Sequence, residues 1–214
     1  GEQGFGRGQF TIRNGRRCSA AVAFLRPAMK RPNLTVVTRA HTTRVVMEGT
    51  RAVGVEYLKG GQLVRADAEA EVILSGGVFN SPQLLMLSGI GPADHLRDVG
   101  IPPVVDLPGV GANLRDHMAV MPTYERREAG PFVADMRLDR MTRNIVRAYL
   151  FGTGPASWLP NGLHGFMKTR PELAVPDIQF LFRSTAPGAH LWFPGIRRAF
   201  DDAIGMRPVL LHPE

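Results

Sequence analysis

Two adjacent glycines, Gly76 and Gly77, follow a short apolar run and precede Ser81 and Pro82. Glycine lets the main chain turn tightly and lets a ligand approach it closely. Ser is a favoured helix N-cap and Pro a favoured first helical residue, so a helix is predicted to begin here. The first turn of a helix offers unpaired N–H groups and a partial positive charge. These residue types therefore predict a site at which main-chain atoms hold a phosphate or a ribose.

The elements that would position this site are a strand before the glycines and a helix after them. Residues 72–74 (Val-Ile-Leu) are typical of a buried strand, and Leu84, Leu85 and Leu87 give the helix an apolar face up to a stop at Gly89. A strand, a glycine turn and a capped helix form the unit with which doubly wound proteins hold nucleotides. Glycine pairs also occur in βα turns that bind nothing, and the pattern alone favours this plainer alternative.

Several longer motifs occur in an order that one enzyme family shares. Residues 77–91 resemble the second signature of the glucose-methanol-choline (GMC) oxidoreductases, which are flavin enzymes that oxidise alcohols. The similarity is greatest to the choline-dehydrogenase-like branch, and it covers roughly residues 10–120. The other motifs that resemble family segments lie at residues 14–21, 24–27, 31–36, 51–57 and 107–117.

This resemblance implies an α/β fold in two parts. Residues 1–119 would form a partial FAD-binding, Rossmann-like domain with an inserted β-meander, and residues 120–214 would form part of an α+β substrate-binding domain. The implied cofactor is FAD. The family pattern places its contacts at Thr42, Gly77, Val78, Ser81 and Asn113.

The predicted contacts at Thr42, Gly77 and Val78 are main-chain contacts, which tolerate almost any side chain. Val78 departs from the family pattern, which has a small residue, usually alanine, at this position. A β-branched side chain is stiff, so it would crowd a bound nucleotide or shift the turn. For Thr42 the alternative is an ordinary strand residue without a ligand.

No catalytic residue is assigned within the chain. The family's catalytic histidine lies in a C-terminal segment beyond the matching residues, and its dinucleotide fingerprint lies near the N-terminus. The glycines at residues 4–8 do not fit that fingerprint, because no strand precedes them and no apolar helix follows. We therefore expect an internal fragment of an enzyme that transfers hydride from the CH–OH group of an alcohol, choline-like or another primary alcohol, to the flavin.

The expected partners are a small-molecule alcohol and the remaining N- and C-terminal segments of the same enzyme. The alternative is a non-catalytic relic or split-gene subunit that needs a partner fragment to bind FAD. The isolated chain is predicted to be poorly stable, because a strand at residues 72–74 would lack its neighbours and leave apolar faces exposed.

Composition argues against several other classes of protein. The 214 residues carry 26 basic and 19 acidic side chains, a net charge of +7, but the arginines are scattered without interleaved aromatics, so a nucleic-acid-binding module rests on net charge alone.

A single cysteine, Cys18, rules out an internal disulfide and a cysteine-based zinc site, and the six histidines show no metal-ligand spacing. No apolar stretch approaches the roughly 20 residues of a membrane-spanning helix. A reducing, cytoplasmic location is expected.

Periodicity and turn residues predict the remaining elements. Helices are predicted at residues 19–29, 92–99 and 137–151. Trp158, Trp192 and Phe193 are interpreted either as the lining of a substrate pocket or as core. Strands are predicted at residues 34–38, 43–47, 52–58, 62–70, 118–125, 178–182 and 208–212, with a hairpin turn at residues 59–61.

Overall fold

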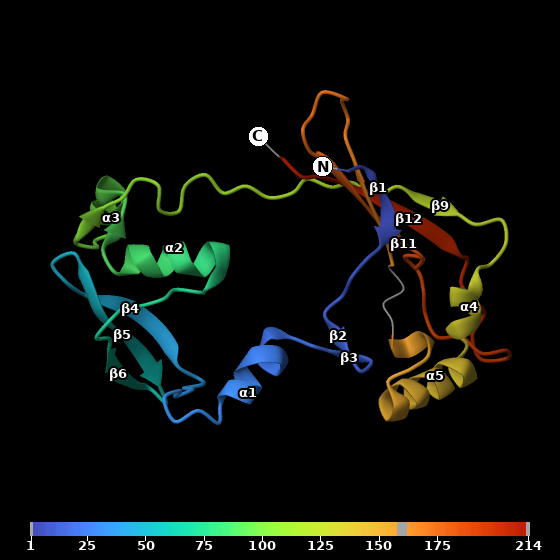
Figure 1. The fold of residues 1–214 in the computed structure, drawn as a ribbon, viewed down its shortest axis with the longest axis horizontal. Helices are drawn as coiled ribbons and strands as arrows, with labels where there is room; N and C mark the ends of the chain where they lie inside the picture. The colour runs from blue at the N-terminus through green and yellow to red at the C-terminus, as the bar shows by residue number, and fades with distance from the viewer. Residues whose placement is uncertain (1, 158–161, 213–214) are drawn as a thin grey trace. The chain divides into compact units, whose positions relative to one another are not determined.

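The computed structural model describes residues 2–157 and 162–212, and the chain divides into two compact units (Figure 1). Unit 1 comprises Gly1–Arg31 and Asp116–Glu214, and unit 2 comprises Pro32–Arg115. The N-terminal residues belong to unit 1 because their first strand pairs with a strand of the C-terminal part. The predicted assignment of residues 1–119 to FAD binding and of residues 120–214 to substrate binding stays a prediction.

Unit 2 contains the predicted β-meander. Strands β4 (His41–Glu48), β5 (Arg51–Lys59) and β6 (Gln62–Asp67) pair antiparallel in the order β4-β5-β6. The turns between them need glycine, since φ is +58° at both Gly49 and Gly60, a region that other residues rarely adopt. The strands predicted at residues 43–47, 52–58 and 62–70 and the turn at residues 59–61 are confirmed, with β6 ending at Asp67.

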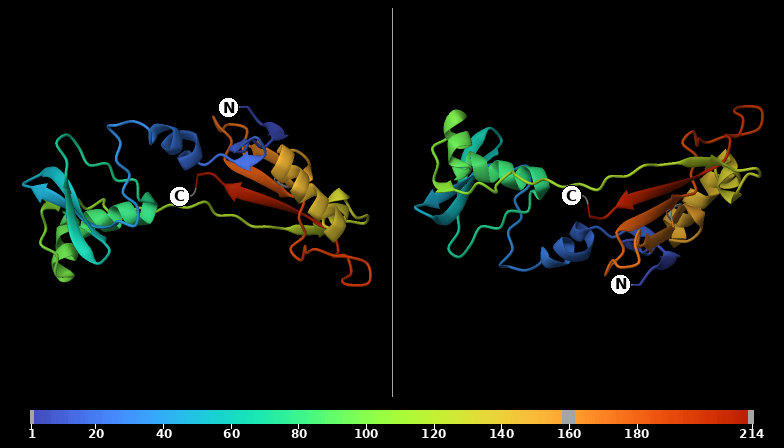
Figure 2. Two further views of the ribbon diagram at one scale, coloured as in Figure 1. Left: turned by 90° about the horizontal axis from the view of Figure 1, so that it is seen from below. Right: turned by 90° about the horizontal axis from the view of Figure 1, so that it is seen from above.

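Helix α2 (Gly77–Leu87) packs against β4 in unit 2, as the two further views in Figure 2 also show. Ser88, directly after the helix, is buried and joins the two elements. Its hydroxyl accepts a hydrogen bond from the Val45 N–H at 2.8 Å and donates one to the Leu84 carbonyl at 2.6 Å. This single side chain therefore fixes the end of α2 against the middle of β4.

A second helix and a short parallel strand pair complete unit 2. Helix α3 (Ala93–Asp98) confirms the helix predicted at residues 92–99, and its Leu96 is fully buried. Strands β7 (Ile90–Gly91) and β8 (Val105–Asp106) pair in parallel on either side of this helix in the sequence.

Two predicted strands of unit 2 are wrong. Residues 34–38 and 72–74 have the expected β-branched and apolar composition, but neither segment is a strand. Within the part of the chain that the structure describes, no strand pairs with either of them. An extended backbone needs a ladder of hydrogen bonds to a neighbour to form a strand. The Ile73 side chain, predicted to be buried, is 75% exposed.

The predicted start of the following helix is also wrong. Helix α2 begins at Gly77 with Gly76 as its N-cap, so Ser81 is not the cap and Pro82 lies inside the helix. The Ser81 hydroxyl instead reaches back and accepts a hydrogen bond from the Gly76 N–H at 3.0 Å, while the Asn80 amide donates to the Gly76 carbonyl at 3.1 Å. These two side chains satisfy the Gly76 main chain, which allows the helix to begin one turn earlier.

Unit 1 is built on a five-stranded antiparallel sheet in the order β1-β10-β11-β12-β9. The strand predicted at residues 178–182 is confirmed, whereas the sheet uses residues 203–210 where 208–212 were predicted and only residues 123–125 of the predicted 118–125. The strands are β1 (Gly4–Arg7), β9 (Thr123–Glu125), β10 (Leu163–Met167), β11 (Ile178–Arg183) and β12 (Ala203–Leu210).

Short helices and a hairpin accompany this sheet. Helix α5 (Leu138–Phe151) confirms the prediction at residues 137–151, and it ends at Gly152 with φ at +66°. The helix predicted at residues 19–29 is confirmed as a π-helical turn and α1. The full set comprises a hairpin of β2 (Ile12–Arg13) and β3 (Arg16–Arg17), η1 (Ala21–Leu25), α1 (Arg26–Ala28), α4 (Pro131–Asp135), α5 and η2 (Pro155–Ser157).

The core of unit 1 lies around α4. Val133, Ala186, Phe200 and Ala203 are buried together, and Trp192 packs against them. The Trp192 indole N–H donates to the Val133 carbonyl at 2.7 Å, which is the usual arrangement for a buried indole. Of the two interpretations of Trp192, the structure supports the core; Trp158 lies outside the described residues.

Candidate functional site

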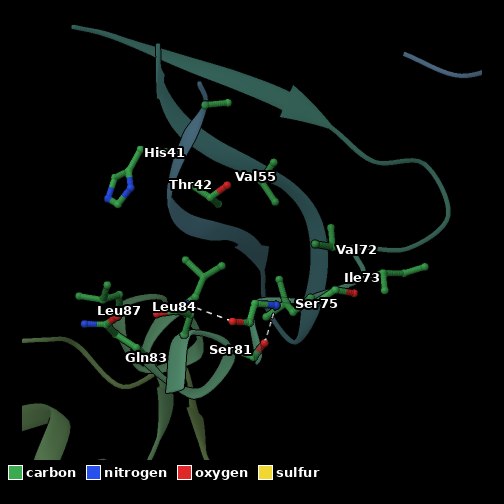
Figure 3. A pocket seen from close by; sticks show the side chains of 14 residues that line it. His41, Thr42, Val55, Val72, Ile73, Ser75, Ser81, Gln83, Leu84 and Leu87 are labelled. Carbon is green, nitrogen blue, oxygen red and sulfur yellow. Dashed lines mark hydrogen bonds between the residues drawn. The ribbon is translucent and has the colours of Figure 1, made fainter. Parts of the chain in front are cut away.

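A concave pocket of about 730 Å³ lies in unit 2 between β4, β5 and one face of α2 (Figure 3). His41 and Thr42 enter it from β4, and Ser81, Leu84 and Leu87 face them from α2. This volume is within the range of about 300–1,000 Å³ that is usual for small-molecule and cofactor sites. We call it the glycine pocket, and its lining consists of residues 40–42, 55, 72–76, 80, 81, 83, 84 and 87.

The lining of the glycine pocket contains no Asp, Glu, Lys or Arg. The walls are apolar at Val55 and Leu84, with neutral polar groups at Thr42 and Ser81. A ligand in this pocket would therefore be held by shape, by neutral hydrogen bonds and by the main chain.

The main chain is open to approach at the start of α2. Gly77 has φ at +87°, and a Cβ atom built there would meet no heavy atom within 4 Å. Any other residue would be strained in this conformation, and its side chain would occupy the open space beside the backbone. The neighbouring Gly76 is tighter, because a Cβ there would lie 3.0 Å from the Asn80 Cβ. The pair thus combines a fixed turn with an uncovered helix N-terminus, which suits a phosphate or a ribose.

The five predicted contact residues all lie in unit 2, but only four of them line one of two pockets, and Gly77 lines neither. Thr42 and Ser81 line the glycine pocket, whereas Val78 and Asn113 line a neighbouring pocket of about 370 Å³ that also includes Met86 and Leu114. Gly77 lies between Gly76 of the first pocket and Val78 of the second. Val78 is 62% exposed, and Gly76 and Gly77 are exposed as well.

Sequence reasoning missed four polar residues of the glycine pocket, His41, Ser75, Asn80 and Gln83. Asn80, Gln83, Leu84 and Leu87 recur at intervals of three and four, which places them on one face of a helix. That signal was present in the sequence, but placing the helix start at Ser81 left Asn80 outside the helix.

A charged pair stiffens the strands behind the pocket without entering it. The Arg44 guanidinium on β4 donates two hydrogen bonds to the Glu56 carboxylate on β5, at 2.7 and 2.9 Å. The hydrogen bond from Arg44 holds the pKa of the Glu56 carboxyl below its ordinary value, and the same contact raises the pKa of Arg44. The pair joins residues that lie opposite each other in the antiparallel ladder.

No group of three or more His, Cys, Asp or Glu side chains that could hold a metal ion occurs among residues 2–157 and 162–212. In the same residues, no helix combines the length and the apolar character that crossing a bilayer requires.

Relatives of known name match most of the chain. A choline dehydrogenase, mitochondrial, of Homo sapiens is 44% identical over 208 residues, which are 95% of this chain and 34% of that protein. An oxygen-dependent choline dehydrogenase of Staphylococcus aureus is 44% identical over 181 residues, 85% of this chain and 32% of that protein. The chain thus spans about a third of the length of the curated relatives it matches.

Solved structures share the fold. A formate oxidase of Aspergillus oryzae, determined in a study of FAD modification, aligns with a TM-score of 0.78 and 26% identity over 95% of this chain and 39% of that one. A pyridoxine 4-oxidase of Mesorbium loti, with a TM-score of 0.73 and 24% identity over 98% of this chain and 37% of that one, supports the fold alone. The predicted mixed α/β fold is confirmed.

The family profile described as GMC oxidoreductase matches residues 1–119, which is more than half of the chain. Together with the FAD-containing formate oxidase structures, this match confirms FAD as the predicted cofactor. The resemblance inferred from the sequence motifs is therefore confirmed, and the chain belongs to the GMC oxidoreductase family.

Proposed function

We propose that this chain forms the FAD-binding part of an oxidoreductase that oxidises the CH–OH group of an alcohol, choline-like or another primary alcohol. The family match and the similarity to choline dehydrogenases support the reaction class. When bound, FAD supplies the hydride acceptor, and the protein supplies orientation and electrostatics. The alcohol and the remaining segments of the same enzyme are the partners in this proposal.

The observation that carries the proposal is the uncovered main chain at Gly77. A positive φ angle and open space above the backbone let a nucleotide lie against peptide atoms at the start of α2. Thr42 and Ser81 would hold the ligand from opposite walls of the glycine pocket, and Val78 and Asn113 would contact it from the neighbouring pocket. In this arrangement the chain binds and orients the cofactor, and none of its residues is assigned to proton transfer.

The absence of acidic residues from the pocket lining also suits the proposal. No carboxylate of the lining competes with the phosphates of FAD for the partial positive charge at the start of α2. The apolar walls at Val55 and Leu84 would shield a planar ring of the ligand from water, and burial of apolar surface favours binding.

The experiment is a titration of the chain with FAD, followed by quenching of flavin fluorescence, on the wild type and two alanine variants. Gly77→Ala places a methyl group in the open space and strains the turn, so we expect FAD affinity to fall at least about tenfold. Gly60→Ala is a matched control, because Gly60 also has a positive φ angle and open space but lies in the β5–β6 turn. Circular dichroism checks that both variants fold.

Equal losses of FAD affinity in the two variants would refute the assignment of Gly77. If the wild-type chain binds FAD only together with family segments that lie outside residues 1–214, a second fragment is needed for binding, as in the split-subunit alternative. If FAD does not bind even then, the proposed function is wrong.

A further inference from the structure

A second concave pocket, of about 640 Å³, lies entirely within unit 1. Four arginines, Arg13, Arg16, Arg17 and Arg26, share its lining with the exposed rings of Tyr149 and Phe151. No Asp or Glu is present in the lining. We call it the arginine pocket, and it consists of residues 13, 14, 16–18, 22, 26 and 149–152.

A tight hairpin concentrates this positive charge. Asn14 and Gly15 form its turn with φ angles of +53° and +67°, the combination that a two-residue hairpin requires. The pairing places Arg13 directly opposite Arg16, with Arg17 opposite Ile12. Like charges at directly opposed positions destabilise a strand pair. The register therefore places one pair of like charges, Arg13 and Arg16, opposite each other at an electrostatic cost that a bound anion would offset, and Arg17 lines the same pocket.

The protein itself supplies no counter-charge. No Asp or Glu occurs anywhere between Gln3 and Met47. Arg16 is partly used internally, since it donates to the Tyr149 carbonyl at 3.3 Å and its Cζ lies 5.4 Å from the centre of the Tyr149 ring. Among the described residues, no carboxylate forms an ion pair with Arg13, Arg17 or Arg26.

We propose that the arginine pocket binds a phosphorylated aromatic small molecule of the nucleotide class, separate from the FAD of the glycine pocket. Guanidinium groups present paired N–H donors that match phosphate oxygens. The Tyr149 and Phe151 side chains are 71% and 73% exposed and offer ring faces on which a base can stack. The pocket's volume suits one small molecule.

Phosphate and aromatic groups occur together both in free nucleotides and in FAD, so the experiment must separate these sources. The probes are inorganic pyrophosphate, ADP and FAD, each titrated by calorimetry into the full chain. ADP should bind about fivefold or more tightly than pyrophosphate, because it adds the stacking of a base. Phe151→Ala should reduce that advantage, because only the Tyr149 ring remains for stacking, and should change pyrophosphate affinity much less.

Charge variants test the phosphate half of the site. Arg17→Gln and Arg26→Gln lie on different elements, and each should weaken both pyrophosphate and ADP by about tenfold, the loss typical of a hydrogen bond to a charged group. Arg207→Gln is the matched control, because Arg207 is an exposed arginine of unit 1 outside the pocket. Arg207→Gln should change the affinities for pyrophosphate and ADP by no more than about twofold, because salt screens a surface charge that lies far from the bound anion.

Three results would overturn the proposal. Equal weakening in Arg207→Gln would mean that net charge alone attracts the anion. A loss of FAD affinity in Arg17→Gln as large as the loss of ADP affinity would identify FAD's own diphosphate as the anion. Tighter binding of a single-stranded oligonucleotide than of ADP would indicate a nucleic-acid surface. An absence of FAD binding even with the flanking family segments added, together with intact Arg17-dependent ADP binding, would refute the proposed function and leave this inference standing.

Discussion

The glycine pocket and the arginine pocket are of similar size but differ in how each would hold an anion. The first has no Asp, Glu, Lys or Arg in its lining and lies beside the main chain at a helix start. The second is lined by four arginines. Positively charged side chains therefore line the arginine pocket and not the pocket assigned to the cofactor.

The variant with the largest expected effect should disrupt the glycine pocket and leave the arginine pocket intact. Leu96 is fully buried in α3 of unit 2, so Leu96→Ala should cost about 2–5 kcal/mol of unit 2 stability. We expect faster amide hydrogen exchange throughout Pro32–Arg115 and weaker FAD binding, measured by mass spectrometry and flavin fluorescence. Pyrophosphate binding in unit 1 should persist.

Val99→Ala provides the control for Leu96→Ala, because Val99 follows the same helix but is 54% exposed. Its exchange rates should stay close to the wild type. If Leu96→Ala also abolishes pyrophosphate binding, the two pockets are not independent and the comparison fails.

The next effect concerns the link between the two walls of the glycine pocket. Ser88→Ala removes the acceptor of the buried Val45 N–H, which leaves an unsatisfied donor and should cost about 1–3 kcal/mol. Because β4 carries Thr42 and α2 carries Ser81, FAD affinity should fall together with the stability of unit 2. Denaturant unfolding and FAD titration measure the two quantities.

Two variants make the Ser88 test specific. Ser88→Thr keeps the hydroxyl and should restore most of the FAD affinity. Thr142→Ala removes a hydroxyl that donates to the Leu138 carbonyl on the exposed helix α5, and it should leave FAD affinity unchanged. Equal stability losses in Ser88→Ala and Thr142→Ala would show that the buried position of Ser88 carries no special role.

The salt dependence of binding compares the two pockets directly. Raising the salt concentration from about 0.1 M to 1 M shortens the screening length from about 10 Å to 3 Å, so exposed guanidinium groups lose much of their attraction for an anion. Pyrophosphate affinity at the arginine pocket should fall severalfold, and FAD affinity at the glycine pocket should fall less. Calorimetry at several salt concentrations gives the two slopes, and equal slopes would contradict the distinction between the pockets.

The sequence predicted elements well where their partners are close along the chain. Strands β4, β5 and β6 follow one another through tight turns, so composition and turn glycines were sufficient. Residues 34–38 and 72–74 have similar composition but no pairing strand among the described residues, and strand formation depends on such a neighbour. Local pattern cannot supply that information.

The candidate site was predictable in part for the same reason. The glycine turn and its helix are local features, so the sequence predicted a helix after the glycines, although it placed Gly77 in the turn and the structure places it as the first residue of α2. The arginine pocket joins residues 13–26 with residues 149–152, and nothing in the periodicity of either segment indicates that they meet. The scattered arginines looked unremarkable in sequence because only the fold brings four of them together.

The smallest expected effect is the acid sensitivity of the meander. The hydrogen bond from Arg44 lowers the pKa of Glu56, so the folded state favours the ionised carboxylate. This contribution to stability is complete above the carboxyl group's ordinary pKa of about 4.3 and is lost as pH falls through the lowered pKa of the folded state. Glu56→Gln should therefore remove part of the acid-induced fall in the thermal midpoint of unit 2, and Arg44→Gln should remove the same part.

This effect is expected to be small because Arg44 is 55% exposed and water screens such pairs. Asp177 of unit 1 also has a lowered pKa, caused by its hydrogen bonds from Thr169, so unit 1 has an acid sensitivity of its own that neither variant should change. Guanidinium groups keep their charge throughout this pH range. Acid should therefore weaken the walls of the glycine pocket through Glu56 while the charge of the arginine pocket persists, and a pH profile that Glu56→Gln leaves unchanged would refute the role of the pair.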